Sequence, residues 1–208
     1  MSTLTSLPNL LTLMRIVLIP VFIGVYYLPF EGAHVAAAII FALASVTDWL
    51  DGFLARRLKQ MSPFGAFLDP VADKLLIAST LLVLVSAKDI NYIVLPAIVI
   101  VGREIVISAL REWMAEVGSR TSVAVSYVGK IKTAMQMIAL ILLIAFPPET
   151  TFLGIIGFIL LYVAAILTIW SMVVYLTIAW PQLTEKNLKK AVDSVLNSGK
   201  IPPEDMRE

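Results

Sequence analysis

Apolar residues in this chain of 208 residues gather into six runs, each near the ~20 residues that a helix needs to cross a bilayer. The runs cover residues 8–29, 33–56, 66–87, 91–114, 126–147 and 151–180. Short polar breaks end the first, third and fifth runs, as in hairpins of antiparallel helices, and longer polar connections separate the others. We therefore expect an all-α membrane protein with six transmembrane helices in one domain, residues 1–181, and a charged cytoplasmic tail, residues 182–208.

Composition supports lipid as the main solvent of the chain. Hydrophobic residues make up 59% and charged residues 15%, whereas a soluble domain is about half apolar and about a quarter charged. The net charge of +1 does not suggest nucleic-acid binding, and the lack of cysteine excludes disulfides and thiol chemistry. The N-terminus has neither a basic stretch nor a small-residue cleavage motif, so we expect no cleaved signal peptide.

Basic residues are distributed unevenly between the two sets of helix ends. One set has only Lys88, and the other carries Arg56, Arg57, Lys59, Arg120, Lys130, Lys132 and the lysines of the tail. Because basic residues concentrate in cytoplasmic loops, we expect both termini and both long connections to lie in the cytoplasm.

Four carboxylates lie where an apolar helix would carry none. Asp48 and Asp51 are three residues apart and Asp69 and Asp73 are four apart, so each pair projects from one helix face. A charge costs roughly 2.5–3.5 kcal/mol at the centre of a membrane helix, which indicates a functional pocket. Clustered carboxylates repel one another unless cations neutralise them, and their hard oxygens suit Mg²⁺, Mn²⁺ or Ca²⁺. Two such ions that share carboxylates are familiar in phosphoryl chemistry.

The spacing alone leaves two other interpretations of these carboxylates open. They could form structural salt bridges with Arg56, Lys74, Arg103 and Arg111. The chain could also be a cation transporter, since intramembrane carboxylates often carry protons or cations. A transporter would need charged sites that continue to the outer face, where the runs are apolar.

The residues around the carboxylates form a longer pattern. From Asp48 to Asp73 the sequence reads D-x2-D-G-x2-A-R-x8-G-x3-D-x3-D, with eight fixed positions over 26 residues. This stretch resembles the signature of the CDP-alcohol phosphatidyltransferase family in every fixed position and every spacing. The resemblance implies a six-helix membrane fold, usually a homodimer, that binds a CDP-activated lipid at the cytoplasmic face.

The family resemblance also implies roles for individual residues. Asp48, Asp51 and Asp69 would ligate metal ions, and Asp73 would ligate the second ion and act as the general base. Contacts to the CDP-lipid are implied for Asn9, Thr12, Gly52, Arg56 and Ser62. A glycine lets a nucleotide approach the helix backbone closely, and the planar fork of an arginine suits diphosphate oxygens.

A second set of residues bears on the alcohol that accepts the phosphatidyl group. Arg103 and Arg111 are eight positions apart, which places them about 80° apart around a helix, where they can line one cavity. Lys130 and Lys132 open the fifth run. An acceptor phosphate explains such a basic cluster, because a desolvated dianion needs cations. Lysine anchoring at a helix end, and an ion pair between Arg103 and Glu104, are the simpler alternatives.

Three further segments are Pro8-Asn9-Leu10-Leu11-Thr12, Ala109-Leu110-Arg111-Glu112-Trp113 and Gly129-Lys130-Ile131-Lys132-Thr133. Through them the chain resembles, over residues 7–180, one branch of the family, the bacterial phosphatidylglycerophosphate synthases. That resemblance implies transfer from CDP-diacylglycerol to sn-glycerol 3-phosphate in the bacterial inner membrane, giving phosphatidylglycerol phosphate and CMP, with two divalent ions, Mg²⁺ or Mn²⁺. We expect direct transfer, because no Ser, His or Cys is placed as a covalent nucleophile. Inositol phosphate, serine or phosphatidylglycerol as the acceptor is the alternative within the family.

Overall fold

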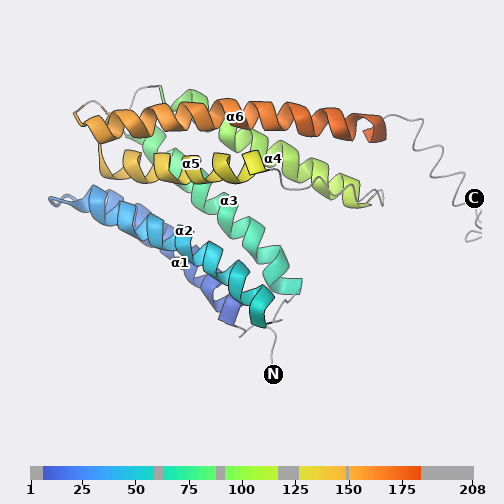
Figure 1. The fold of residues 1–208 in the computed structure, drawn as a ribbon. Helices are drawn as coiled ribbons and strands as arrows, with labels where there is room; N and C mark the ends of the chain where they lie inside the picture. The colour runs from blue at the N-terminus through green and yellow to red at the C-terminus, as the bar shows by residue number, and fades with distance from the viewer. Residues whose placement is uncertain (1–6, 59–62, 88–91, 117–126, 149, 184–208) are drawn as a thin grey trace, which may run out of the picture.

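The computed structural model describes residues 7–58, 63–87, 92–116, 127–148 and 150–183, which form six α-helices and no strand (Figure 1). The helices are α1, Leu7–Tyr26; α2, Ala33–Leu58; α3, Pro63–Ser86; α4, Val94–Glu116; α5, Tyr127–Ala145; and α6, Phe152–Leu183. Each predicted apolar run corresponds to one helix, which confirms the all-α prediction. The third helix begins at Pro63, three residues before the predicted run, because proline fits the first turn of a helix, where its missing N–H has no partner to lose.

Two groups of helices make up the bundle. α1 packs along α2 and against α3, whereas α6 packs along α5 and against α4, and contacts between α2 and α5 join the groups. Figure 1 shows the α1–α2 and α5–α6 pairs close together at the ends with the short connections and diverging toward the opposite ends. α2 ends and α5 begins on this diverging side, which is also the side of the two longer connections.

The bundle has an apolar core that is supplied by all six helices. Phe22 of α1 and Phe41 of α2 are fully buried, with ring centroids 6.1 Å apart. Ala37 and Ala44 are buried on α2, and small residues of this kind let membrane helices approach closely. Close packing of this interior, rather than exclusion of water, is expected to hold the helices together in lipid.

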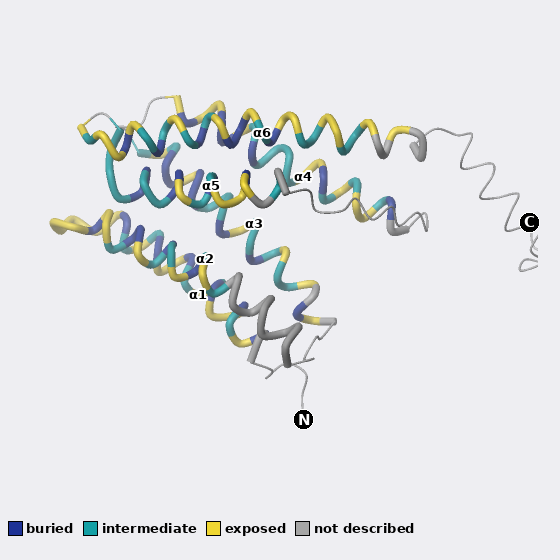
Figure 2. The backbone as a smooth tube through the Cα atoms, viewed as in Figure 1, coloured by how far each residue is buried: buried dark blue, intermediate teal, exposed yellow. Residues whose placement is uncertain are grey.

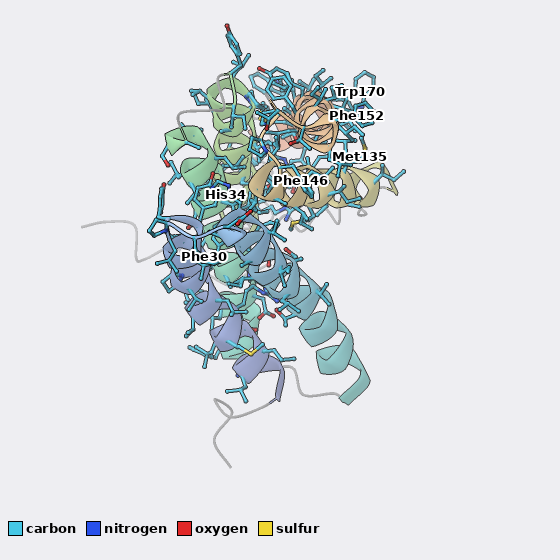
Figure 3. The ribbon with its side chains drawn as sticks, turned by 90° about the vertical axis from the view of Figure 1, so that its left-hand side faces the viewer. Phe30, His34, Met135, Phe146, Phe152 and Trp170 are labelled. Atoms are coloured by element: carbon cyan, nitrogen blue, oxygen red, sulfur yellow. The ribbon has the colours of Figure 1, made fainter. Side chains whose placement is uncertain are left out.

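Large apolar side chains also cover the outside of the bundle. Figure 2 shows exposed positions along the outer sides of α1 and α6, and Figure 3 shows Phe152 and Trp170 on the outer side of α6. These two side chains are 75% and 68% exposed. Soluble monomers rarely expose contiguous apolar surface on this scale, so the exposed side chains indicate a membrane protein.

Among the described residues, two segments are long and apolar enough to cross a membrane, Asn9–Tyr26 and Phe152–Thr177. The apolar stretches Ala33–Thr47 and Ile131–Ala145 are shorter. The six-helix prediction is therefore confirmed for the helices, and the spanning prediction is supported by this test for α1 and α6. Charged residues interrupt the apolar stretches of the four helices between them.

Gly157 lies where α6 crosses α5 closely. A Cβ atom at this position would lie 2.8 Å from Cβ of Leu142 and 3.2 Å from the carbonyl oxygen of Ala139. Gly24 in α1 offers the matched contrast, since a Cβ atom there has no neighbour within 4 Å. The α5–α6 crossing therefore depends on the absence of a side chain at Gly157.

We predict that Gly157→Ala destabilises the bundle by about 1–3 kcal/mol, because overpacking pushes the two helices apart. The apparent Tm in detergent should fall by roughly 3–10 °C. Gly24→Ala is the control and should leave the Tm unchanged or slightly higher, because alanine favours a helix. Equal Tm values for the two variants would contradict the close crossing.

Candidate active site

Two of the predicted carboxylates lie on one face of α3, in contact with α1. Asp69 and Asp73 are separated by one helical turn, and α1 packs against this part of the bundle. Thr12 Oγ1 donates a hydrogen bond of 2.6 Å to Asp69 Oδ1. Arg15 Nη1 donates a hydrogen bond of 2.8 Å to Asp73 Oδ1, and these two side chains also form an ion pair. Residues three apart on α1 thus hold carboxylates four apart on α3.

Solvent reaches one partner of the ion pair between Arg15 and Asp73 but not the other. The Arg15 side chain is 0% exposed, whereas the Asp73 side chain is 41% exposed. A buried guanidinium is tolerated only when it is paired and hydrogen-bonded, so this contact is a strong constraint on how α1 and α3 pack. The Asp73 carboxylate is therefore accessible to solvent, whereas Arg15 lies on its buried side.

The two residues of α1 that were predicted to contact the CDP-lipid are also buried. Asn9 is 2% exposed and Thr12 is 0% exposed. With Arg15 they occupy an arc of about 120° on α1, the face that packs inward. The Thr12 hydroxyl donates a hydrogen bond to Asp69, so Thr12 contacts a carboxylate of the site.

The remaining predicted residues of the signature belong to α2 and the connection after it. Asp48, Asp51, Gly52 and Arg56 lie in the last turns of α2, Ala33–Leu58, but their side chains are outside the described part of the structure. Ser62 lies outside the described residues altogether. Within the described part, no group of three or more His, Cys, Asp or Glu side chains is arranged to hold a metal ion. Asp69 and Asp73 nevertheless offer carboxylate oxygens from one helix face, and this donor type fits Mg²⁺ or Mn²⁺.

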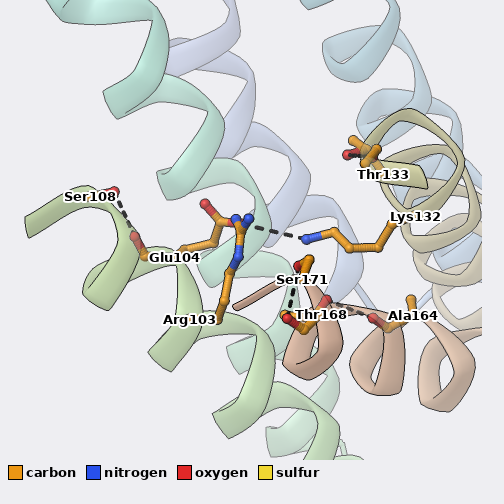
Figure 4. A network of polar contacts seen from close by, with 9 residues as sticks. Arg103, Glu104, Ser108, Lys132, Thr133, Ala164, Thr168 and Ser171 are labelled. Carbon is orange, nitrogen blue, oxygen red and sulfur yellow. Dashed lines mark hydrogen bonds and ion pairs between the residues drawn. The ribbon is translucent and has the colours of Figure 1, made fainter. Parts of the chain in front are cut away.

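A second polar cluster joins α4 and α5 (Figure 4). Arg103 Nη1 donates to Glu104 Oε1 at 2.6 Å, and Lys132 Nζ lies 4.0 Å from the same oxygen. Lys132 is only 7% exposed, and Arg103 and Glu104 are partly buried. Among the described side chains, the cluster holds two basic groups and one carboxyl group, so cations outnumber anions in a largely desolvated place. The buried Nε of Arg103 has no hydrogen-bond partner among the described residues.

Two other residues were predicted to bind the acceptor phosphate, Arg111 and Lys130. Neither is among the described contacts of this cluster. Arg111 lies two turns beyond Arg103 and is exposed, with its guanidinium carbon 5.7 Å from the ring centre of Tyr175 on α6. Lys130 lies in the first turn of α5, and its side chain is outside the described part. The structure therefore brings together Arg103 and Lys132, through Glu104, and places Arg111 on the surface shared with α6.

Comparisons with known proteins decide the family. Residues 5–170 match the family model of the CDP-alcohol phosphatidyltransferases. The chain belongs to the CDP-alcohol phosphatidyltransferase family. Relatives include proteins of Pseudomonas fluorescens, 52% identical over 89% of this chain and 95% of the relative, and Yersinia enterocolitica, 53% identical over 86% and 98%. A protein of Sodalis glossinidius is 54% identical over 86% of this chain and 98% of its own. All three are named CDP-diacylglycerol–glycerol-3-phosphate 3-phosphatidyltransferase.

In this member of the family, Arg15 belongs to the site although it is not part of the signature pattern. The salt-bridge alternative named Arg56, Lys74, Arg103 and Arg111 as partners for the carboxylates, but the ion pair recorded for Asp73 is with Arg15. A signal was present in the sequence, because Arg15 is the one charged residue in the apolar run 8–29 and follows Thr12 by three positions. An unexplained cation inside a membrane helix predicts a carboxylate partner on a neighbouring helix.

The Thr12–Asp69 contact yields a stability prediction. Thr12→Val keeps the shape of the side chain and removes the hydroxyl, so the Asp69 carboxyl group loses a hydrogen-bond donor. The protein should therefore lose about 1–3 kcal/mol of unfolding free energy. Thr12→Ser should keep most of the stability. The loss should shrink in an Asp69→Asn background, as measured by SDS unfolding followed by circular dichroism. The same loss in both backgrounds would show that the hydroxyl acts elsewhere.

Proposed function

We propose that this chain is an integral membrane enzyme that transfers the phosphatidyl group of CDP-diacylglycerol to sn-glycerol 3-phosphate. The observation that carries the proposal is the half-exposed carboxylate of Asp73. It lies on the face of α3 that also bears Asp69, and it is paired with the buried Arg15. The family membership supports the donor class. The names of the relatives support the acceptor.

The donor site is proposed at the diverging end of α1, α2 and α3. Asp48, Asp51, Asp69 and Asp73 would hold two divalent ions there, Mg²⁺ or Mn²⁺, while Gly52, Arg56, Ser62, Asn9 and Thr12 would line the CDP-lipid site. When bound, the ions would withdraw charge from the diphosphate and stabilise the departing CMP. The lipid tails of the donor stay in the bilayer, and its polar head faces the cytoplasm.

The acceptor site is proposed around Arg103 and Lys132. Among the described side chains, the basic groups of this cluster outnumber its one carboxyl group, and the buried N–H of Arg103 Nε has no acceptor. Both features favour an anionic group, and a phosphate offers the oxygens that an arginine fork binds best. Lys130 and Arg111 would extend this positive surface toward the cytoplasm. Glu104 would hold both cations in place until the phosphate arrives.

The reaction is proposed as one in-line displacement. Asp73 accepts the proton of the primary hydroxyl of glycerol 3-phosphate, and that oxygen forms a bond to the phosphorus that carries diacylglycerol. The bond between this phosphorus and the CMP oxygen breaks, and CMP leaves with the electron pair. The basic cluster orients the acceptor, and the apolar helices around the site limit access of water that would otherwise hydrolyse the donor.

The membrane arrangement is part of the same proposal. The exposed apolar surface and the segments Asn9–Tyr26 and Phe152–Thr177 support insertion in a bilayer. We propose six crossings of the bacterial inner membrane, with both termini, the tail 182–208 and the active site on the cytoplasmic side, and a homodimer as the working form. Labelling of single cysteines placed in residues 57–65 and 149 tests the orientation, because the first should react only from the cytoplasm.

Two alternatives make different chemical demands. Serine carries no phosphate and would leave the proposed phosphate site at Lys132 unused, whereas inositol phosphate would use it equally well. A cation transporter would use the carboxylates but not the basic cluster on α4 and α5. Release of CMP by purified protein supplied with CDP-diacylglycerol and a panel of acceptors separates these cases.

Asp73→Asn should abolish turnover, because the amide cannot take the proton of the acceptor hydroxyl. Binding of CDP-diacylglycerol in the presence of Mg²⁺ should remain largely intact, since three carboxylates are kept. CMP release and donor binding measured on the same preparation test this. Substantial turnover at neutral pH would remove Asp73 from the role of base.

Arg103→Ala and Lys132→Ala should each raise the acceptor KM far more than the donor KM. Loss of one charge-assisted contact in a desolvated pocket costs about 1.5–3 kcal/mol, or roughly 10- to 150-fold in acceptor efficiency. Arg103→Lys should restore part of the loss, because the charge returns without the planar fork. Arg111→Ala is the comparison and should have a smaller effect, since Arg111 is exposed. Normal glycerol 3-phosphate kinetics in folded Arg103→Ala and Lys132→Ala would defeat the assignment of the acceptor site.

A further inference from the structure

Arg15 has no role in the signature pattern, yet it makes the ion pair recorded for Asp73. Its side chain is fully buried, so substrates cannot touch it. A cation of this kind is expensive to place inside a helix bundle, and it is kept where a carboxylate needs it. The buried guanidinium must therefore change the orientation or the environment of the Asp73 carboxylate.

The contact fixes one oxygen of Asp73 at a defined place. Arg15 Nη1 binds Oδ1 at 2.8 Å, and the neighbouring Thr12 holds Oδ1 of Asp69 in the same manner at 2.6 Å. Both donors come from α1, and both carboxylates come from one face of α3. Two side chains of α1 therefore each bind one oxygen of a carboxylate on α3, which restricts the side-chain orientation of Asp69 and Asp73.

We propose that Arg15 is a positioning residue that holds Asp73 in the orientation required of the general base. The proposal rests on the proposed function. By fixing Oδ1 from behind, Arg15 prevents the carboxylate from turning fully toward the metal ions. Asp73 then keeps the geometry that proton transfer from the acceptor hydroxyl requires.

The loss of Arg15 should have two effects of opposite sign. Divalent ions would bind as tightly as before or more tightly, because a fixed positive charge a few ångströms away no longer repels them. Turnover would slow, because Asp73 is no longer aimed at the hydroxyl. A purely structural role of Arg15 predicts instead that stability, metal affinity and turnover fall together.

The experiment uses the full-length protein in detergent, with three variants. Arg15→Met has a similar length and no charge, and Arg15→Lys keeps the charge but loses the fork. Thr80→Val is the control, because Thr80 is fully buried on α3 and its hydroxyl bonds to the carbonyl oxygen of Leu76 in the same helix. For each variant, kcat and both KM values are measured from CMP release, and Mn²⁺ affinity is measured by electron paramagnetic resonance without substrates.

We expect kcat of Arg15→Met to fall about 100-fold, the loss typical of a small misplacement of a reacting group. Both KM values should change little, and Mn²⁺ should bind with equal or greater affinity. Arg15→Lys should bind Mn²⁺ like the unchanged protein and have an intermediate kcat. Thr80→Val should lose some stability and keep its kcat.

Several outcomes overturn the proposal. The first is a kcat equal to that of the unchanged protein in folded Arg15→Met or in Arg15→Lys. The second is a joint fall of Mn²⁺ affinity and kcat in either variant. If Arg15→Met does not fold, the kcat and Mn²⁺ affinity of Arg15→Lys decide by the same criteria. If the unchanged protein binds no Mn²⁺ and turns over in chelator, the metal part of the proposed function fails, and this inference falls with it.

Discussion

A buried arginine needs a carboxylate, and the arrangement of the first three helices follows from that requirement. Arg15 is sealed inside the bundle, so α1 must lie along the face of α3 that carries Asp73. α2 packs along α1, and its last turns carry the other half of the signature. One ion pair between helices thus fixes the relative placement of the segments that the proposed donor site needs.

The polar groups of the described structure fall into two centres of opposite character. The centre between α1 and α3 has two carboxylates at its surface and a cation behind one of them. The centre between α4 and α5 has two cations and a single carboxylate between them. A diphosphate that binds through divalent ions suits the first centre, and a phosphate-bearing alcohol suits the second. In an otherwise apolar bundle, this separation of charge supports a reaction between two anionic substrates that would repel each other in water.

Charged residues account for the uneven apolar character of the helices. α1 and α6 contain segments long enough to cross a membrane, whereas charged residues interrupt the apolar stretches of α2 to α5. Polar groups inside a membrane bundle are tolerated where they face one another or a cavity. The apolar stretches of α2 to α5 are therefore shorter because these helices also carry charged residues.

The sequence by itself determined the six helices and the family. Apolar runs of membrane length form helices because every backbone group must be paired inside lipid, and this rule is local in the chain. Spacings of three and four residues likewise predicted that Asp69 and Asp73 share one face, because helical geometry is also local. Only the tertiary structure decided that Arg15 and Thr12 hold these carboxylates, that Glu104 joins Arg103 to Lys132, and that Arg111 lies against Tyr175 instead. These contacts depend on the rotation and sliding of one helix against another, which close packing of whole faces sets and which no spacing within a single helix specifies.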